Sequence, residues 1–230
     1  MDKKVAPPAE KFASCPYDGK ILEYYEGYFE SVYVLLHPFL RSSKINLKER
    51  AYKTWPRKHE IISKCEAVTW SEVMNLSGLN TISEIDIGLR TSIQGLTEEF
   101  SNKDYSARIE SLLESNGISQ DSEGDLQAFL EDKIIKAIKS LGHEWLWLGD
   151  EHGFERKLHW IDDILQGDML PPSGCIFTHD HSILITTHWD SHCSFLCGSK
   201  QDIDKILEYQ KFEGFFCTEN TEVYWGLHKI

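Results

Sequence analysis

The sequence lacks an apolar run that approaches the ~20 residues needed to span a bilayer. Its first residues, MDKKVAPPAEKFASCPYDG, hold charges and prolines but no apolar centre of a signal peptide. We therefore expect a cytoplasmic protein that does not bind a membrane. The chain also lacks any mark of export, so its six cysteines are expected to be reduced thiols rather than a disulfide framework.

Basic residues are scarce: 24 Lys and Arg stand against 37 Asp and Glu, which gives a net charge of -13. A molecule of this charge repels phosphate backbones, so nucleic acid is not an expected partner. The excess is uneven, because residues 141–230 carry 6 basic and 15 acidic groups, a net charge of -9. An acidic C-terminal portion favours a basic protein as partner. The oligomeric state is left open by the sequence.

Familiar catalytic motifs are also missing. The chain has no G-x-G-x-x-G, no G-x-x-x-x-G-K and no G-x-S-x-G, so neither a phosphate-binding loop nor a nucleophile elbow is indicated. His59-Glu60 and His143-Glu144 begin like zinc-protease helices, but Ser63 and Trp147 stand where the second histidine should be. No catalytic residue can be named on this basis, and no cofactor is expected.

The order of patterns predicts an α+β protein, with a helical N-terminal portion followed by a mainly antiparallel sheet with one or two helices. Prolines and glycine in residues 1–20 indicate a poorly ordered leader. Residues 21–116 form the helical portion, and the polar stretch NGISQDSEG separates it from an α+β portion at residues 124–230. The two portions are either separate domains or one continuous domain.

Helices are expected where apolar residues recur three or four apart. ILEYYEGYFESVYVLLHPFL, from residue 21, shows this spacing and predicts a buried helix with an aromatic stripe. Thr69 and Glu72 have the spacing of a capping box that opens a helix ending near Gly78. The same criteria predict helices over residues 83–94, 103–115, 126–141 and 154–165. A further helix is predicted over residues 199–210, where Ser199 and Asp202 have the spacing of a capping box.

Strand patterns dominate the C-terminal portion. HEWLWLG alternates Trp145 and Trp147 with leucines, and five further apolar runs look like strands. These runs are CIFT, ILITTHW, CSFLC, EGFFC and EVYWGL.

Residues 41–64 are the one basic patch, with eight Lys or Arg, two Glu, and Tyr52 and Trp55 among them. Basic residues interleaved with aromatic ones can hold a nucleic-acid strand, which makes regulatory nucleic-acid binding a third functional hypothesis. We favour a helix face that balances an acidic neighbour, because the whole chain is acidic and shows no recognition helix.

The stretch THDHSILITTHWDSHC, residues 178–193, raises the possibility of a metal site. His188, Asp190 and His192 carry donors that suit Zn or Mn. On one straight strand they would span about 13 Å, so they could meet one ion only if the chain turns at Asp190-Ser191. His179, Asp180 and His181 are reserve ligands, but in a three-stranded meander they would lie about 20 Å away, at the other end of the middle strand. Histidines on two separate loop tips are therefore the favoured interpretation.

At HPF (37–39) and THWDSHCSFLCGS (187–199) the sequence resembles a group of uncharacterised cytoplasmic proteins of Bacillus-type bacteria. The resemblance covers most of the chain and implies a bacterial cytoplasmic origin, without an activity to carry over. The C-terminal order of strands, helix and strands is also similar to small α+β immunity proteins that neutralise bacterial toxins, although architecture alone does not fix function.

The leading hypothesis is a non-catalytic protein-interaction protein, immunity-like or regulatory. It rests on the acidic C-terminal portion and on its tryptophans 145, 147, 160, 189 and 225, because Trp is enriched at binding hot spots. The alternative is a metal-dependent hydrolase, in which an ion held by His188, Asp190 and His192 lowers the pKa of bound water and a carboxylate removes its proton.

Overall fold

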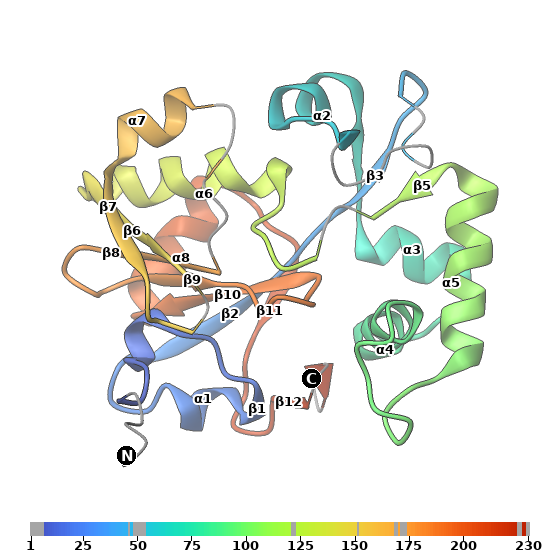
Figure 1. The fold of residues 1–230 in the computed structure, drawn as a ribbon, viewed down its shortest axis with the longest axis horizontal. Helices are drawn as coiled ribbons and strands as arrows, with labels where there is room; N and C mark the ends of the chain where they lie inside the picture. The colour runs from blue at the N-terminus through green and yellow to red at the C-terminus, as the bar shows by residue number, and fades with distance from the viewer. Residues whose placement is uncertain are drawn as a thin grey trace, which may run out of the picture.

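A seven-stranded antiparallel sheet forms the centre of the computed structural model, which describes residues 7–45, 47, 54–120, 123–150, 152–167, 170, 174–224 and 227–228. The expected antiparallel α+β fold is confirmed. Figure 1 shows the sheet on the left of the molecule. Its strands follow the order β11 (Gly214–Phe216), β2 (Ser31–Leu36), β10 (Cys193–Gly198), β9 (Leu184–Thr186), β8 (Cys175–Thr178), β6 (Trp145–Gly149) and β7 (Arg156–Trp160).

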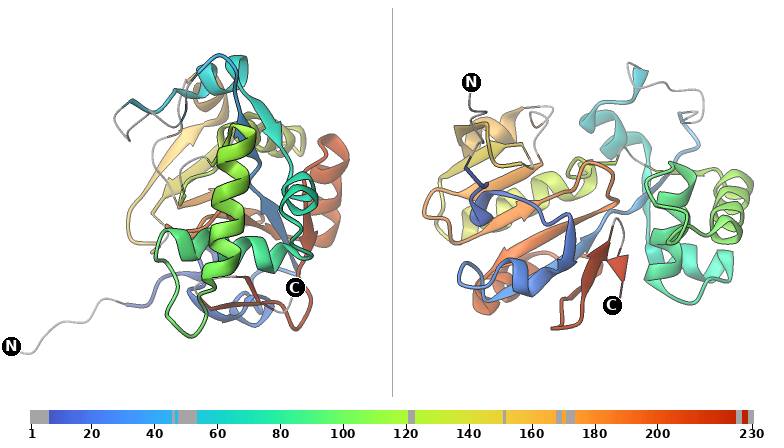
Figure 2. Two further views of the ribbon diagram at one scale, coloured as in Figure 1. Left: turned by 90° about the vertical axis from the view of Figure 1, so that its right-hand side faces the viewer. Right: turned by 60° about the horizontal axis from the view of Figure 1, so that its bottom comes forward.

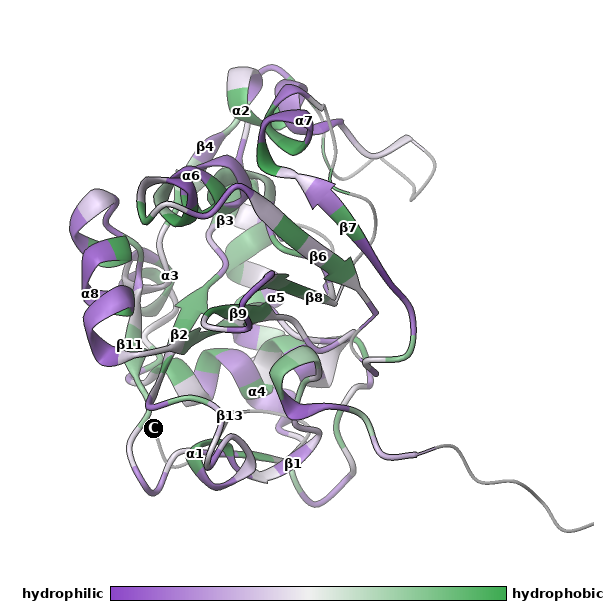
Figure 3. Cartoon of the chain, turned by 90° about the vertical axis from the view of Figure 1, so that its left-hand side faces the viewer, coloured by the Kyte–Doolittle hydropathy of each residue, from purple (hydrophilic) through white to green (hydrophobic). Residues whose placement is uncertain are grey.

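The central strands β2, β10, β9 and β8 are buried on both faces, and β2 shows how. Val32, Val34 and Leu36 belong to one apolar cluster, while Tyr33 and Leu35 belong to another. The second cluster lies under the helices α6 (Ala128–Ser140), α7 (Ile161–Gln166) and α8 (Lys200–Tyr209). The first lies under the N-terminal segment, with the short helices η1 (Lys11–Ala13) and α1 (Ile21–Tyr24). β2 is largely green, that is hydrophobic, in Figure 3.

Four helices and a small sheet form a separate lobe beside the large sheet. The small sheet has the order β4 (Glu66–Val68), β3 (Phe39–Arg41), β5 (Ile118–Ser119), and the helices are α2 (Lys58–Lys64), α3 (Trp70–Ser77), α4 (Ile82–Ser92) and α5 (Lys103–Asn116). Figures 1 and 2 show α3, α4 and α5 on one side of the molecule, away from α6, α7 and α8. A third sheet joins β1 (Asp18–Lys20), β12 (Glu222–Tyr224) and β13 (Leu227–His228).

Side-chain caps begin three helices of this lobe, and the one at Thr69 is the cap that the sequence predicts. The side chain of Thr69 accepts a hydrogen bond from the Glu72 backbone at the start of α3, and Gly78 ends that helix in the left-handed conformation. Thr81 and Asn102 cap α4 and α5 in the same way. The predicted helices at 83–94, 103–115, 126–141 and 199–210 are all present, with ends shifted by at most a few residues.

The prediction of one long helix from residue 21 is wrong. Only Ile21–Tyr24 is helical, Gly27 turns the chain with a φ of 80°, and SVYVLL becomes β2. A strand buried on both faces shows no polar alternation, so its apolar residues also fit a helical period. Because β2 lies inside the large sheet, the order of helices first and sheet second does not hold, and the portions 21–116 and 124–230 share one sheet.

The described part of the expected leader, residues 7–20, is packed rather than loose. Ala13 and Cys15 are buried, and Glu10 forms an ion pair of 2.8 Å with Arg156 of β7. Residues 154–165, expected as one helix, divide into the end of a turn, β7 and α7.

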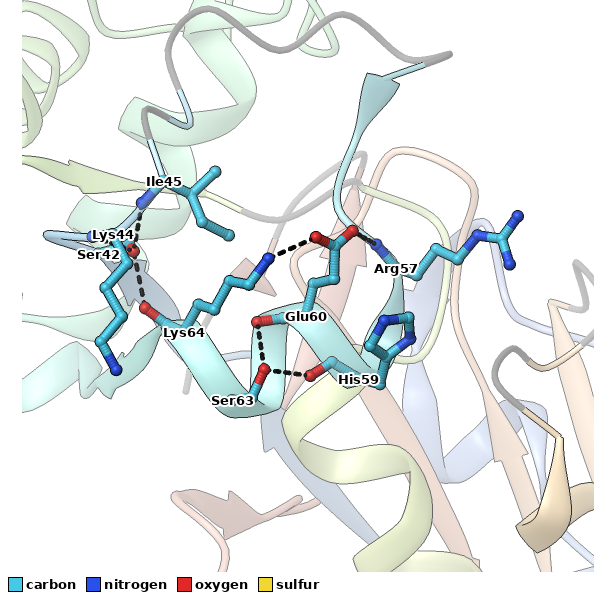
Figure 4. Close-up of polar contacts among 8 residues, drawn as sticks. All are labelled: Ser42, Lys44, Ile45, Arg57, His59, Glu60, Ser63 and Lys64. Carbon is cyan, nitrogen blue, oxygen red and sulfur yellow. Dashed lines mark hydrogen bonds and ion pairs between the residues drawn. The ribbon is translucent and has the colours of Figure 1, made fainter.

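Three described basic residues of the patch 41–64, Arg41, Lys58 and Lys64, pair with acidic groups. Lys58 is buried and lies 2.8 Å from Glu131 and 2.9 Å from Asp132 of α6. Figure 4 shows the pair of Lys64 with Glu60 at 2.7 Å. In the same view Ser42 donates a hydrogen bond to the Lys64 carbonyl, so the start of the patch is tied to the end of α2. Tyr52 lies outside the described residues.

Candidate functional site

The turn between β9 and β10 is the centre of the candidate site. The backbone of Ser191 donates a hydrogen bond to the carbonyl of His188 at 2.9 Å, so the chain turns at Trp189 and Asp190. This turn lies one residue earlier than the one expected at Asp190-Ser191. Since β8, β9 and β10 form a meander, this turn and the β8–β9 turn lie at opposite ends of β9, as the sequence predicts.

A buried ion pair fixes this turn to α4. Arg90, 3% exposed, places Nη2 at 3.2 Å from Oδ1 of Asp190, which is 1% exposed. The Arg90 Nη1 donates to the Asp190 carbonyl and to the Ser191 hydroxyl, both at 3.3 Å. His188 binds the same Oδ1 through Nδ1. We call Arg90, His188, Asp190 and Ser191 the polar junction.

The polar junction keeps Asp190 ionised. Burial alone would raise the pKa of the Asp190 carboxyl, but the hydrogen bond from His188 and the charge of Arg90 more than offset it, so this pKa is lowered. A carboxylate accepts hydrogen bonds only, so Nδ1 of His188 carries the proton. In the neutral ring, Nε2 is therefore unprotonated and can accept a hydrogen bond.

Two glycines allow the turn to approach its neighbours closely. A Cβ on Gly124, whose φ is 85°, would lie 2.4 Å from the carbonyl oxygen of Trp189. Gly124 instead donates its backbone N–H to Ser191 O at 3.2 Å. A Cβ on Gly95 would lie 3.0 Å from Oδ2 of Asp190. The segment after β5 and the end of α4 therefore hold the turn from two sides.

Two neutral histidines lie behind the turn. His37 and His192 are neighbours across β2 and β10, and the His37 N–H donates to the His192 carbonyl at 3.1 Å. Burial, with the nearby His192, lowers the pKa of His37 to about 3. Burial, with the charge of Arg90, lowers the pKa of His192 to about 4. Both rings are therefore uncharged at neutral pH.

A small cavity separates the histidine pair from the lobe. It has a volume of about 10 Å³ and is lined by His37, Pro38, Phe39, Trp70, Leu89, Gln120 and His192. This is room for about one water molecule and excludes an organic substrate. The Nε2 of His37 lies 2.7 Å from the Ser194 hydroxyl, which lies 2.6 Å from the Thr187 hydroxyl.

Four rings meet on the surface over the polar junction. Tyr17 contacts His152 through a hydrogen bond to Nδ1, and the centroids of the two rings are 5.9 Å apart. The edge of Tyr17 meets His188 at 5.2 Å, and His188 lies 5.6 Å from Trp189. Tyr17 is 37% exposed and Trp189 is 52% exposed. We call Tyr17, His152, His188 and Trp189 the aromatic patch.

The residues proposed as metal ligands are distributed unevenly. His188 and Asp190 contact each other, whereas His192 lies beside His37, behind the turn. The structure's described part holds no group of three or more His, Cys, Asp or Glu side chains arranged to bind a metal ion. Metal binding by His188, Asp190 and His192 stays a prediction.

The reserve ligands lie in the β8–β9 turn, and each contacts a different neighbour. His179 Nδ1 lies 3.3 Å from Nε1 of Trp147, and the ring of His181 stacks on Phe12 at 3.9 Å. The Asp180 carboxylate accepts from the Ser182 N–H at 3.1 Å and from its hydroxyl at 2.8 Å. Thus these three side chains diverge toward different neighbours.

Five of the six cysteines are buried, Cys217 is half-buried, and none forms a disulfide. Cys193 contacts the polar junction, with its Sγ 3.8 Å from the Ser191 hydroxyl. Burial raises the pKa of the Cys193 thiol to about 12. A thiol of this pKa is protonated at neutral pH and a poor nucleophile.

Comparison with known proteins places this site in a family. Residues 17–227 match the family described as "Protein of unknown function (DUF2711)". The chain belongs to the DUF2711 family. A relative is "Uncharacterized protein YwbB" of Bacillus subtilis (strain 168), which is 20% identical over 215 residues that cover 90% of this chain and 95% of the relative. No solved structure matches the chain.

The expected resemblance to uncharacterised Bacillus-type proteins is therefore confirmed. The DUF2711 match begins at Tyr17, so it includes every residue of the polar junction and the aromatic patch. None of the helices in the described ranges is both long enough and apolar enough to cross a membrane.

The sequence points to His188, Trp189, Asp190 and Ser191 of this DUF2711 site, but not to its three other residues, Arg90, Tyr17 and His152. Arg90 had a usable signal: Asp86 and Arg90 share the apolar stripe of α4 with Ile85 and Leu89, and charged residues on such a stripe need partners. Tyr17 and His152 gave no signal, because both reach the patch from irregular segments whose positions depend on the whole fold.

Proposed function

We propose that this DUF2711 protein is a non-catalytic interaction protein, and that its aromatic patch binds a basic partner protein. The observation that carries the proposal is the contact of four rings from three distant segments, with the ring of Trp189 half exposed. Exposed Trp and Tyr that are already held in place are typical binding hot spots.

The base of the patch supports this proposal because it is rigid before binding. Trp189 lies between His188 and Asp190, which are tied to each other and, through Arg90, to α4. The Trp189 backbone also lies against Gly124. A side chain on such a base loses little conformational entropy when a partner covers it.

Charge around the patch supports a basic partner. Asp18 follows Tyr17 directly, and Glu123 and Asp125 flank Gly124, which contacts Trp189; all three acids are exposed. These groups add to the net charge of -9 on residues 141–230. Acids around an aromatic centre attract a basic surface toward it, and this attraction weakens as the salt concentration rises. An immunity-like or a regulatory protein would both use such a surface.

Capture from a source lysate tests the proposal. Immobilised wild type is compared with Trp189→Ala and with Tyr209→Ala, a control in which an exposed aromatic residue on α8 is removed. We expect a basic protein that wild type and Tyr209→Ala retain, that salt elutes, and that Trp189→Ala loses. Calorimetry with the purified partner then measures the affinity. A set of captured proteins that is the same for all three baits would contradict the proposal.

The second candidate is a metal-dependent hydrolase at His188, Asp190 and His192. One observation favours it: in the described structure Oδ2 of Asp190 and Nε2 of His192 are buried and have no hydrogen-bond partner. The Arg90 cation beside Asp190 opposes a second cation there. A bound Zn or Mn ion would activate water.

A further inference from the structure

The strand β7 is an open edge of the large sheet. It pairs with β6 on one side, and no other described strand pairs with it. Figure 3 shows β7 at the rim of the sheet, with no labelled strand beyond it. The side chains of Trp145 on β6 and Trp160 on β7, which are cross-strand neighbours, are 46% and 41% exposed.

The register fixes which backbone groups of β7 point outward. Asp150 donates to Glu155 O at 3.0 Å and Ile161 donates to Glu144 O at 2.9 Å, so these are hydrogen-bonded pairs of the β6–β7 ladder. Such pairs alternate along an antiparallel ladder. Lys157 and His159 therefore bond to β6, while the N–H and C=O of Arg156, Leu158 and Trp160 point away from the sheet.

Charge along this edge changes sign. Arg156 and Lys157 open the strand, and Asp162 and Asp163 follow it in the first turn of α7. Lys157 and Asp163 are both exposed. An antiparallel copy of the same edge places basic groups beside acidic ones, whereas a parallel copy places like charges together. The edge is thus complementary to itself in one orientation only.

We propose that two copies of the chain pair through β7 in antiparallel orientation, which makes the large sheet continuous across a twofold axis. With the axis at Leu158, Arg156 faces Trp160 and Lys157 faces His159 of the second copy, and the acidic first turn of α7 follows directly after that end of the second strand. A lysine on an edge strand discourages pairing with most strands, so the acids near the strand end that it meets give this pairing its selectivity.

A matched pair of variants at Leu158 tests the backbone contacts. Leu158→Pro removes an N–H that points outward, which an edge strand tolerates, and Leu158→Ala shortens the side chain but keeps the N–H. Sedimentation velocity over a concentration series up to about 1 mM should show a dimer for wild type and Leu158→Ala. For Leu158→Pro we expect at least a tenfold larger dissociation constant. Circular dichroism checks that each variant folds.

A charge exchange tests the pairing even if the Leu158→Pro variant does not fold. Lys157→Asp should weaken the dimer at least tenfold, and the double variant Lys157→Asp/Asp163→Lys should restore it, because only an antiparallel partner brings these positions together. Trp189→Ala, which changes the β9–β10 turn and leaves β7 intact, should dimerise like wild type. A wild type that stays monomeric throughout, or a dimer that neither Leu158→Pro nor Lys157→Asp weakens, would overturn the proposal.

Discussion

Arg90 and Asp190 show how one ion pair joins two lobes that are mainly held by apolar contacts. The pair lies between α4 and the β9–β10 turn, where both side chains are almost fully buried. Each charge has lost its water, so each depends on the other and on the hydrogen bonds of His188 and Ser191. The turn, and Trp189 on it, therefore keep one geometry only while the pair is intact.

Replacing Arg90 by Met should destabilise the protein strongly. The variant keeps much of the volume but leaves the Asp190 carboxylate buried without its cation, which costs about 3–5 kcal/mol. The control is Arg41→Met, which breaks the 2.7 Å pair of Arg41 with Glu72, both only partly buried. Such a pair contributes at most about 1 kcal/mol. Urea unfolding measures both losses, and equal losses would show that the polar junction is not a special contact.

The metal content of the purified protein follows from the separation of the histidines. Because His192 lies behind the turn and the β8–β9 turn lies at the other end of β9, we expect well under one equivalent of Zn or Mn in untagged protein. Chelator should leave the melting temperature unchanged. About one ion per chain, lost in His188→Ala/His192→Ala, would instead support the hydrolase.

At the scale of elements, local signals predicted what local contacts determine. Caps at Thr69 and Ser199 and regular apolar spacing were sufficient for α3, α6 and α8. The prediction of a helix at β2 is wrong because long-range pairing with Cys193–Gly198 decides the conformation of this segment, and nothing nearby in the sequence shows that partner. The site divides in the same way: His188 and Asp190 are close in the sequence and were found together, while Arg90 is 100 residues away from Asp190 and was missed.

Two glycine variants should separate backbone strain from close contact at the β9–β10 turn. Gly142 and Gly124 both have positive φ, but a Cβ on Gly142 meets nothing within 4 Å, whereas on Gly124 it meets Trp189 O at 2.4 Å. Gly142→Ala should lose about 1 kcal/mol of unfolding free energy through strain alone. We expect a clearly larger loss for Gly124→Ala, measured by urea unfolding. Equal losses would mean that Gly124 is not needed for the approach to the turn.

At the scale of the whole molecule, the two buried histidines should make the fold sensitive to acid. In the folded state the pKa of His192 is about 4 and that of His37 is about 3, against 6.5 for an unperturbed histidine. Below pH 6.5 the unfolded chain therefore binds a proton at His37 and another at His192, whereas in the folded chain both rings stay neutral until the pH nears their lowered pKa values. The stabilisation is complete above pH 6.5 and is lost progressively as the pH falls from 6.5 to about 4 for His192 and to about 3 for His37, at up to about 1.4 kcal/mol per pH unit for each histidine.

Urea unfolding between pH 7.5 and 4.5 should thus show a free energy of unfolding that falls steeply below pH 6.5. His37→Gln and His192→Gln should each be less stable than wild type at pH 7.5, because each disturbs buried packing, but should each have a shallower slope. The double variant should have the smallest slope, since neither position can then take up a proton on unfolding. If the double variant keeps the wild-type slope, other groups cause the acid sensitivity, and the neutral histidine pair between the large sheet and the helical lobe is not its origin.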